Sequence, residues 1–446
     1  MTGTPHPPRP RIDIASAPAS LATPAVPASS PAPAPWRLGM LLAAPHRLGF
    51  ALAMGVLALG SLWWLAELLN RHTGALGLPA PAVPPMLVHA ALMVMGFMPL
   101  FFAGFLFTAG PKWLHVPPYT ARQVLPALLC QAAGWVLWLA GAYLHVAVAA
   151  GALALVTAGL GWMYALFARL VAASGVADRV HAKVVLAAGV LSTLCLGAAA
   201  LALLASRLDV ALALLRTALW GGMAVTYVAV AHRMIPFFTS NALPLVQAWR
   251  PWWVLWFMLA ALIWQVLAVW VPEDWASGAA PGWAWLHTAV QAVQGAVLLW
   301  LALVWGLAQS LRIRLLAMLH VGFVWLGLTL LYGAASQALW LLTGQPVLGL
   351  GALHALGMGF LGSLMVAMVT RVSCGHSGRS LVADDWVWAL FWGLQLAVVL
   401  RLAAAVQGAP AGLTLLAALA WAAVMGAWAL RYLPWYGTPR VDGKPG

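Results

Sequence analysis

Charged residues are scarce in this sequence. Asp, Glu, Lys and Arg make up 7% of its 446 residues, whereas a soluble globular domain carries about 25%. Because 64% of the residues are hydrophobic, the chain cannot cover itself with a surface compatible with water, which excludes an ordinary soluble protein. Segments of about 10 residues with alternating hydrophobicity, which would predict a membrane β-barrel, are also missing.

Cysteines and acidic residues are few as well. Cys130, Cys195 and Cys374 are the three cysteines, and they have no paired spacing, so no disulfide framework is predicted. Nine acidic residues face 22 Lys and Arg, giving a net charge of +13. These basic residues lie in short segments between apolar runs, where they report membrane orientation. We therefore expect membrane lipid, and no nucleic acid, as a partner.

Long apolar runs fill most of the chain, each near the roughly 20 residues that cross a hydrocarbon core of about 30 Å. They predict an all-α polytopic membrane protein, a bundle of about twelve transmembrane helices within residues 39–433. A flexible Pro/Ala-rich cytoplasmic tail, 1–38, precedes the bundle and a short cytoplasmic tail, 434–446, follows it. The predicted spans are 47–69, 86–110, 122–146, 148–170, 183–205, 209–231, 251–271, 283–308, 314–342, 349–371, 385–407 and 411–431.

The distribution of basic residues predicts the orientation. With a cytoplasmic N-terminus, the outer segments receive only Arg71 and Arg207, besides the acidic stretch PEDW at 272–275. Nearly all other Lys and Arg residues then fall on the inner side, as the positive-inside rule requires. Both termini are therefore predicted to be cytoplasmic.

Two histidines enter apolar spans at matched depth. His89 and His354 each lie about four to six residues inside a span that starts at the outer face, roughly 6–9 Å along the helix. Met93 and Met358 follow them by four positions, on the same helix faces. Each imidazole could simply hydrogen-bond within the bundle. Two at one depth instead suit the axial ligation of a haem iron.

Two arginines lie inside spans near the same depth. Arg216 is in the sixth span and Arg401 in the eleventh, both toward the outer face. A buried arginine needs an anion, and haem propionates would supply one. The alternatives are that these side chains extend to the interface, or pair with Glu67 or Asp209.

The remaining polar positions are weaker signals. His320 lies in the inner half of the ninth span and could ligate a second metal. Cys374 and His376 are two positions apart, in a predicted inner loop, and would suit copper or zinc if a third ligand joined them. His232 precedes a predicted structured loop at 232–250. The histidines at span ends or in loops, which need no special account, are His46, His72, His115, His145 and His181.

The chain resembles the NnrS family of bacterial inner-membrane proteins, which are associated with denitrification and nitric oxide stress. The resemblance rests on LVHAALMVMGFMPLFFAGFLFTAGPKW (87–113), HRMIPFFTSN (232–241), LHVGFVWLGL (319–328) and LHALGMGFLGSLMVAMVTRVSCGHSGR (353–379). It implies about twelve helices, a haem, expected to be of b type, and copper. It carries over His89, His320, His354 and His376 as metal ligands, and also Arg371 and Arg379.

The chain departs from the family pattern at Ala91 and Leu92, where the family commonly has a histidine and a glutamate. A more distant similarity is to the catalytic subunits of haem–copper oxidases, which also place haem histidines at the outer ends of the second and tenth of twelve helices. The seventh span, 251–271, lacks the histidine pair of those oxidases, so we expect no oxygen-reducing centre.

Three hypotheses for the function follow. The first is a haem-binding inner-membrane protein of the nitric oxide response, which handles nitric oxide or its iron adducts, or relays electrons to or from a redox protein. Whether it catalyses a reaction is left open; an oxidoreductase of nitrogen-oxide metabolism would fit. The second is a cofactor-free transporter, suggested by helix breaks at Pro99, Gly104, Gly357 and Gly359. The third is an assembly subunit of a respiratory complex.

Overall fold

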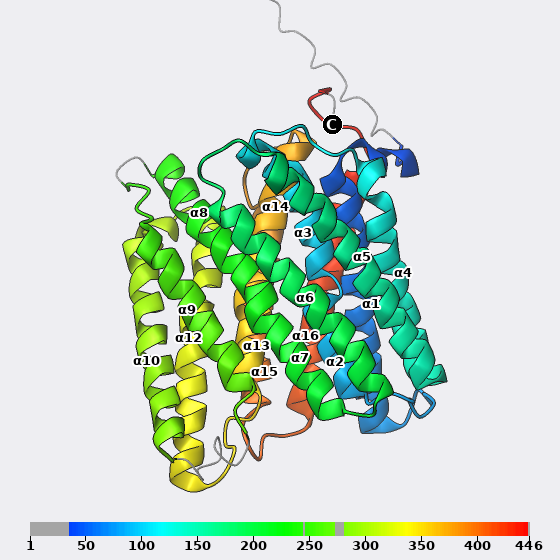
Figure 1. Cartoon of the computed structure of the whole chain (residues 1–446), viewed down its shortest axis with the longest axis vertical. Coiled ribbons are helices and arrows are strands. Elements are labelled where there is room, and N and C mark those ends of the chain that lie inside the picture. The colour runs from blue at the N-terminus through cyan, green and yellow to red at the C-terminus, as the bar shows by residue number, and fades with distance from the viewer. Residues whose placement is uncertain (1–34, 244–245, 273–280, 445–446) are drawn as a thin grey trace, which may run out of the picture. The chain divides into compact units, whose positions relative to one another are not determined.

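The computed structural model describes residues 35–243, 246–272 and 281–444. Within these ranges every element is helical and no strand occurs (Figure 1). Twelve helical segments are long and apolar enough to span a membrane. The prediction of an all-α bundle of about twelve transmembrane helices is thus confirmed.

Most spans are single helices, and three are composite. The single helices are α1 (Pro45–Thr73), α4 (Ala121–Leu144), α5 (Val146–Ala173), α6 (Val180–Leu204), α9 (Trp252–Val269), α10 (Pro281–Val304), α12 (Arg314–Thr343), α15 (Asp385–Ala403) and α16 (Gly412–Tyr436). The composite spans are α2 (Pro85–Met95) with α3 (Met98–Leu114), α7 (Leu208–Thr217) with η2 (Ala218–Ala224) and α8 (Val225–Ala242), and α13 (Gly351–His354) with η4 (Ala355–Gly362) and α14 (Ser363–Ser377). Two short helices, η1 (Leu38–Ala43) and α11 (Leu307–Ser310), complete the set.

The composite spans are the second, sixth and tenth. Between α2 and α3 the helix is interrupted at Gly96 and Phe97, just before Pro99, whose ring cannot donate a backbone hydrogen bond. Segments η2 and η4 are π-helical, a geometry that occurs mostly as short insertions in α-helices and frequently at functional sites. The second and sixth spans pack together, since α2 contacts both α7 and η2, whereas η4 of the tenth span contacts α12 and α15.

Several spans extend further than predicted at the end that the charge distribution assigns to the cytoplasm. The sixth span continues to Ala242, the tenth to Ser377 and the twelfth to Tyr436, so the predicted loops at 232–250 and after 371 are in part helical. Hydropathy ends a span at its first charged residue, here Arg233, Arg371 and Arg431. A helix continues for as long as its backbone hydrogen bonds are satisfied.

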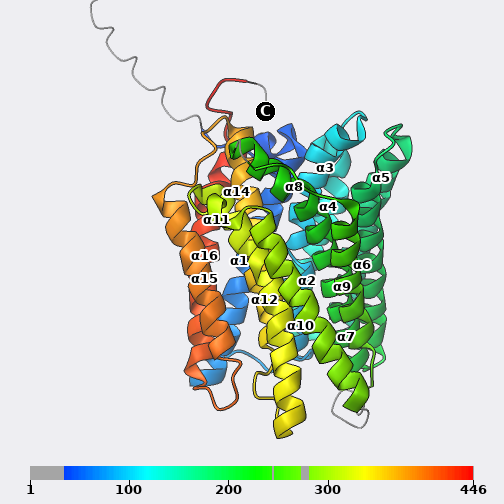
Figure 2. The ribbon, with the colours of Figure 1, turned by 90° about the vertical axis from the view of Figure 1, so that its left-hand side faces the viewer.

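Neighbouring helices form antiparallel pairs, α4 with α5, α10 with α12 and α15 with α16 (Figure 2). The α4–α5 pair depends on small residues. A Cβ atom at Gly159 would lie 2.7 Å from the Ala127 carbonyl oxygen, and one at Gly141 would lie 2.7 Å from the Ala149 nitrogen. Backbones approach this closely only where side chains are absent, as is common between membrane helices.

Both described ends of the bundle meet at one face. The Arg37 backbone nitrogen donates to the Gly437 carbonyl at 2.8 Å. The buried Arg47 guanidinium donates to the carbonyls of Tyr436, at 3.1 Å, and Thr438, at 2.7 Å. Because the number of spans is even, the two ends of the bundle must lie on the same side of the membrane. That it is the cytoplasmic face stays a prediction from the charge distribution.

Candidate functional site

A cavity of about 190 Å³ lies between α1, α2, α7, α13, η4, α15 and α16; we call it the histidine cavity. Its lining includes all six residues for which the sequence predicted cofactor binding: His89, Met93, Arg216, His354, Met358 and Arg401. They come from four spans of the bundle. The rest of the lining is almost entirely apolar, with Trp64 and Trp421 as its largest side chains.

The two imidazoles face each other across this cavity. The ring centres of His89 and His354 are 6.4 Å apart, and the ring planes differ by 20°. The Nδ1 of His354 lies 3.0 Å from the Leu350 carbonyl oxygen. Because a carbonyl only accepts, this Nδ1 carries the proton and Nε2 keeps a free lone pair.

His89 is held differently. Its ring stacks on Trp64, with centres 4.0 Å apart and planes 25° apart. Its Nδ1 is buried and has no hydrogen-bond partner among the described residues. Buried polar atoms are nearly always paired. The Nδ1 of His89 is an exception, so this imidazole can still form a bond.

Neither arginine of the cavity has a carboxylate partner in the described part of the chain. Glu67 is bound to Arg71 at 2.9 Å and accepts from the Tyr143 hydroxyl at 3.1 Å. Asp209 is paired with Arg207 at 2.9 Å. The alternative in which Glu67 or Asp209 neutralises Arg216 or Arg401 is therefore wrong. The Arg216 side chain is exposed and that of Arg401 is half-buried.

The other two predicted metal ligands lie outside this cavity. His320 is fully buried, with its Nε2 at 3.0 Å from the Thr239 hydroxyl and its Nδ1 unpaired. His376 packs against His46, with ring centres 4.3 Å apart. Among the residues that the structure describes, no group of three or more His, Cys, Asp and Glu side chains is placed to hold a metal ion.

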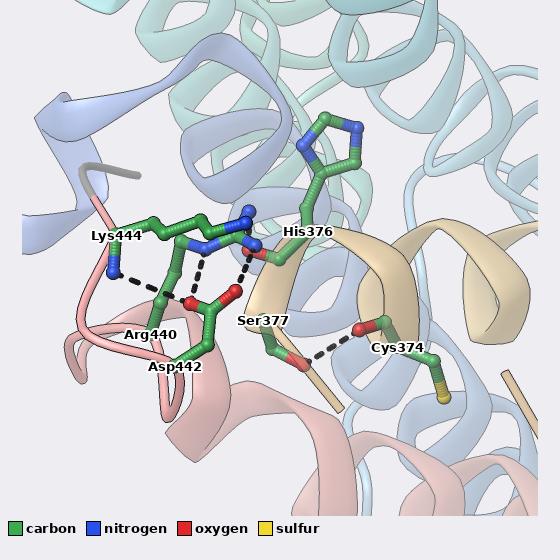
Figure 3. Close-up of polar contacts among 6 residues, drawn as sticks. All are labelled: Cys374, His376, Ser377, Arg440, Asp442 and Lys444. Carbon is green, nitrogen blue, oxygen red and sulfur yellow. Dashed lines mark hydrogen bonds and ion pairs between the residues drawn. The ribbon is translucent and has the colours of Figure 1, made fainter. Parts of the chain in front are cut away.

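Cys374 and His376 do not form a joint ligand pair. Both lie on the last turns of α14, and their side chains extend in opposite directions (Figure 3). The thiol is buried, 3% exposed, whereas the imidazole extends toward α1 and His46. The sequence prediction placed both residues in a loop. They lie on a helix instead, where two positions of separation place side chains about 200° apart.

The C-terminal segment fixes this end of α14. Arg440 donates to the His376 carbonyl at 3.2 Å (Figure 3). The Val441 nitrogen donates to the Ser377 carbonyl at 3.0 Å. The hydrogen-bonded Arg440 guanidinium holds the pKa of the Asp442 carboxyl well below its usual range. Their ion pair is therefore complete at neutral pH and is lost only as the pH falls through this lowered pKa.

A buried histidine pair was missed by sequence reasoning. His181 and His232 are 3% and 0% exposed, and the His181 Nε2 lies 3.0 Å from the His232 Nδ1. The His232 Nε2 donates to the Pro251 carbonyl at 3.2 Å, so its Nδ1 accepts from His181. The two are 51 positions apart, and no spacing rule connects them. His181 and His46, both predicted to need no account, are buried.

Comparison with protein families gives one match that bears on these residues. A family model described as NnrS protein matches residues 40–440, nearly the whole chain. All twelve spans begin and end within that range. Comparison with individually curated proteins gives no match.

Proposed function

Since this chain belongs to the NnrS family, we propose that it is a haem-binding protein of the bacterial inner membrane that acts in the nitric oxide response. The observation that supports this most directly is the His89–His354 pair, whose ring centres are 6.4 Å apart. Two metal–nitrogen bonds of about 2.0–2.1 Å, plus about 1.1 Å from each nitrogen to its ring centre, give roughly 6.3 Å. One iron between the two imidazoles fits this separation.

The unpaired arginines complete the fit. A haem carries two propionates, and a guanidinium binds a carboxylate through parallel hydrogen bonds. Arg216 and Arg401 line the same cavity as the two histidines. They would hold the propionates, while Met93 and Met358 pack against the macrocycle with polarizable, apolar side chains.

The residues around the site determine the kind of chemistry. When bound, the haem would supply one-electron redox chemistry. If His89 and His354 both held the iron, no position would be left for a gas, which favours electron transfer over gas binding to the haem. The Leu350 carbonyl fixes the His354 tautomer, and the apolar lining limits the access of water, which tunes the reduction potential. We propose electron relay, with a redox protein as partner, as the role in the response.

A cofactor-free transporter has less support. Of the helix breaks that suggested it, Gly357 lines the histidine cavity and Pro99 directly follows the lining residue Met98, whereas α3 continues unbroken through Gly104. Glu67, the buried carboxylate of α1, is already bound to Arg71 and Tyr143. Proton or sodium coupling needs an acidic group that is free to load and release its ion.

The direct test is a reduced-minus-oxidised absorption spectrum of the detergent-purified protein, together with iron analysis. We expect a b-type haem spectrum and about one iron per chain, as one bis-histidine site requires. A folded preparation without haem absorbance would refute the proposal. The histidine variants that locate the site are treated in the Discussion.

Removal of the arginines should weaken haem binding without changing the axial ligands. Arg216→Gln and Arg401→Gln each delete a charge-assisted contact worth about 1.5–3 kcal/mol, which corresponds to about ten- to a hundredfold in haem affinity. Haem transfer to apomyoglobin measures this loss. Arg207→Gln is the matched control, because Arg207 is exposed and paired with Asp209. Equal haem retention in all three variants would contradict the propionate assignment.

Copper is the second cofactor that we propose, on family grounds. His320 and His376 are its candidate ligands, although they have different neighbours, Thr239 and His46. Metal analysis should show at least a tenfold loss of copper in the variant of a true ligand, as expected when a ligand or its support is removed. His72→Ala, at an exposed helix end, is the control. Unchanged copper in both His320→Ala and His376→Ala would remove these two residues as ligands.

A further inference from the structure

A second cavity, of about 60 Å³, lies between α3, α8, α12 and α14; we call it the apolar cavity. Its walls are aromatic, aliphatic and methionine side chains, among them Phe101, Phe102, Ala231 and Met365. Most of these residues are buried within the bundle, with Phe101 at 3% and Met365 at 1% exposure.

The two cavities are neighbours along the same helices. Phe97, which precedes α3, and Met98, its first residue, reach the histidine cavity, and Phe101 and Phe102 of α3 reach the apolar cavity. These pairs are four positions apart, about 6 Å along a helix. The π-helical segments η2 and η4 also run between the two cavities. In the tenth span, for example, Met358 of η4 lines the histidine cavity, and residues of α14, which follows η4, line the apolar cavity.

Tyr227 brings an unsatisfied polar group to the apolar cavity. Its side chain lines the cavity and is only 8% exposed. The ring packs against Phe102, at 5.3 Å between centres, and against Phe360, at 6.0 Å. The hydroxyl has no hydrogen-bond partner in the described part of the chain, whereas that of the neighbouring Thr226 donates to the Gly222 carbonyl at 2.9 Å. The Tyr227 hydroxyl keeps some accessible surface, so its proton is free for an acceptor inside the cavity.

Size and polarity limit what can supply that acceptor. One water needs about 10–15 Å³ and two to four polar partners, and here Tyr227 is the one hydroxyl left without a bond in the described lining. An aromatic ring needs more room, since a cavity of about 150 Å³ is known to hold benzene. The volume of about 60 Å³ lies between these limits. It suits a molecule of two heavy atoms that is uncharged and weakly hydrated.

We propose that the apolar cavity is a binding site for a small diatomic gas, held by dispersion contacts and by a hydrogen bond from the Tyr227 hydroxyl. That the gas is nitric oxide rests on the proposed function. The site concentrates the gas within the membrane, one helical turn from the histidine cavity. Because the gas binds outside the haem site, two axial histidines do not prevent it from acting on this protein.

Xenon-129 NMR on the detergent-purified protein tests the cavity without reference to haem. We expect saturable xenon binding in the wild type, lost in Ala231→Phe, which fills the apolar cavity, and in the milder Val230→Phe. Ala140→Phe, at an exposed position of α4, is the matched control and should leave binding unchanged. Ala418→Phe, which fills only the histidine cavity, should leave xenon binding in the apolar cavity in place.

Two xenon results would overturn the site. One is the absence of saturable binding in the folded wild type, as would follow if a lipid or detergent chain filled the cavity. The other is binding that persists unchanged in both filling variants. The xenon result also separates the two proposals, since a protein without haem that binds xenon here retains the gas site and loses the proposed function.

Infrared spectroscopy with nitric oxide tests the ligand and Tyr227. The difference between ¹⁴NO- and ¹⁵NO-equilibrated protein should contain a band of uncoordinated nitric oxide that is absent in Ala231→Phe. Tyr227→Phe should shift this band and weaken nitric oxide binding severalfold while leaving xenon binding in place. A band with the same position and intensity in wild type and Tyr227→Phe would refute the hydrogen bond.

Discussion

Replacement of His89 or His354 by alanine is expected to abolish the haem spectrum, with at least a tenfold loss of haem per folded chain. Each change would remove one of the two proposed iron ligands, whose ring centres are 6.4 Å apart across the cavity in the wild type. Absorption at matched protein concentration measures the loss. His72→Ala is the control, because this imidazole is exposed and lies 3.2 Å from the Leu68 carbonyl of its own helix.

A rescue experiment separates ligation from folding. His354→Gly leaves space where the imidazole stood, and free imidazole in the buffer should enter it and restore the low-spin spectrum. A structural role for His354 predicts no such recovery. If both alanine variants retained the wild-type spectrum, the ligands would lie elsewhere and the histidine cavity would lose its assigned role.

The largest effect on stability is expected from Gly159→Ala on α5. The added Cβ would lie 2.7 Å from the Ala127 carbonyl oxygen and 2.9 Å from both the Cys130 Cβ and the Gln131 nitrogen. Two of these atoms belong to the α4 backbone, so the helices must separate. Overpacking of this kind costs about 1–3 kcal/mol. A lower melting temperature in detergent, followed by size-exclusion chromatography, would report it.

Gly151→Ala provides the matched control on the same helix. A Cβ there meets no atom within 4 Å, and alanine is the better helix former by about 1 kcal/mol. We therefore expect unchanged or slightly higher stability. If the two variants melted at the same temperature, close backbone packing between α4 and α5 would not be the stabilising feature described above.

Local sequence patterns predicted much of the candidate site. His89 and His354 were recognised because an imidazole near the start of an apolar span is conspicuous, and their matched depth follows from counting residues from each span end. Arg216 and Arg401 were recognised in the same way. All four line one cavity together with Met93 and Met358. Depth along a helix is a property of the sequence, which is why these residues were found.

Partners across the bundle were not predictable by the same means. The sequence left open whether Glu67 or Asp209 neutralises the cavity arginines. Glu67 proved to be bound to Arg71 and Tyr143, and Asp209 to Arg207. Pairing of His181 with His232, and of His46 with His376, was not foreseen. The choice of partner depends on which faces of two helices meet.

The sequence by itself determined that the chain is a helical membrane protein with twelve spans. Each apolar run is long enough to cross about 30 Å of hydrocarbon as a helix, and a helix satisfies its backbone hydrogen bonds within itself. Only the tertiary structure decided which spans adjoin, how each is rotated, and therefore which side chains share a cavity. Helices that are apolar on nearly every face do not encode their rotation in a hydrophobic stripe. Their rotation is set by small residues such as Gly159 that let particular backbones approach, and by the hydrogen bonds that the buried polar side chains require.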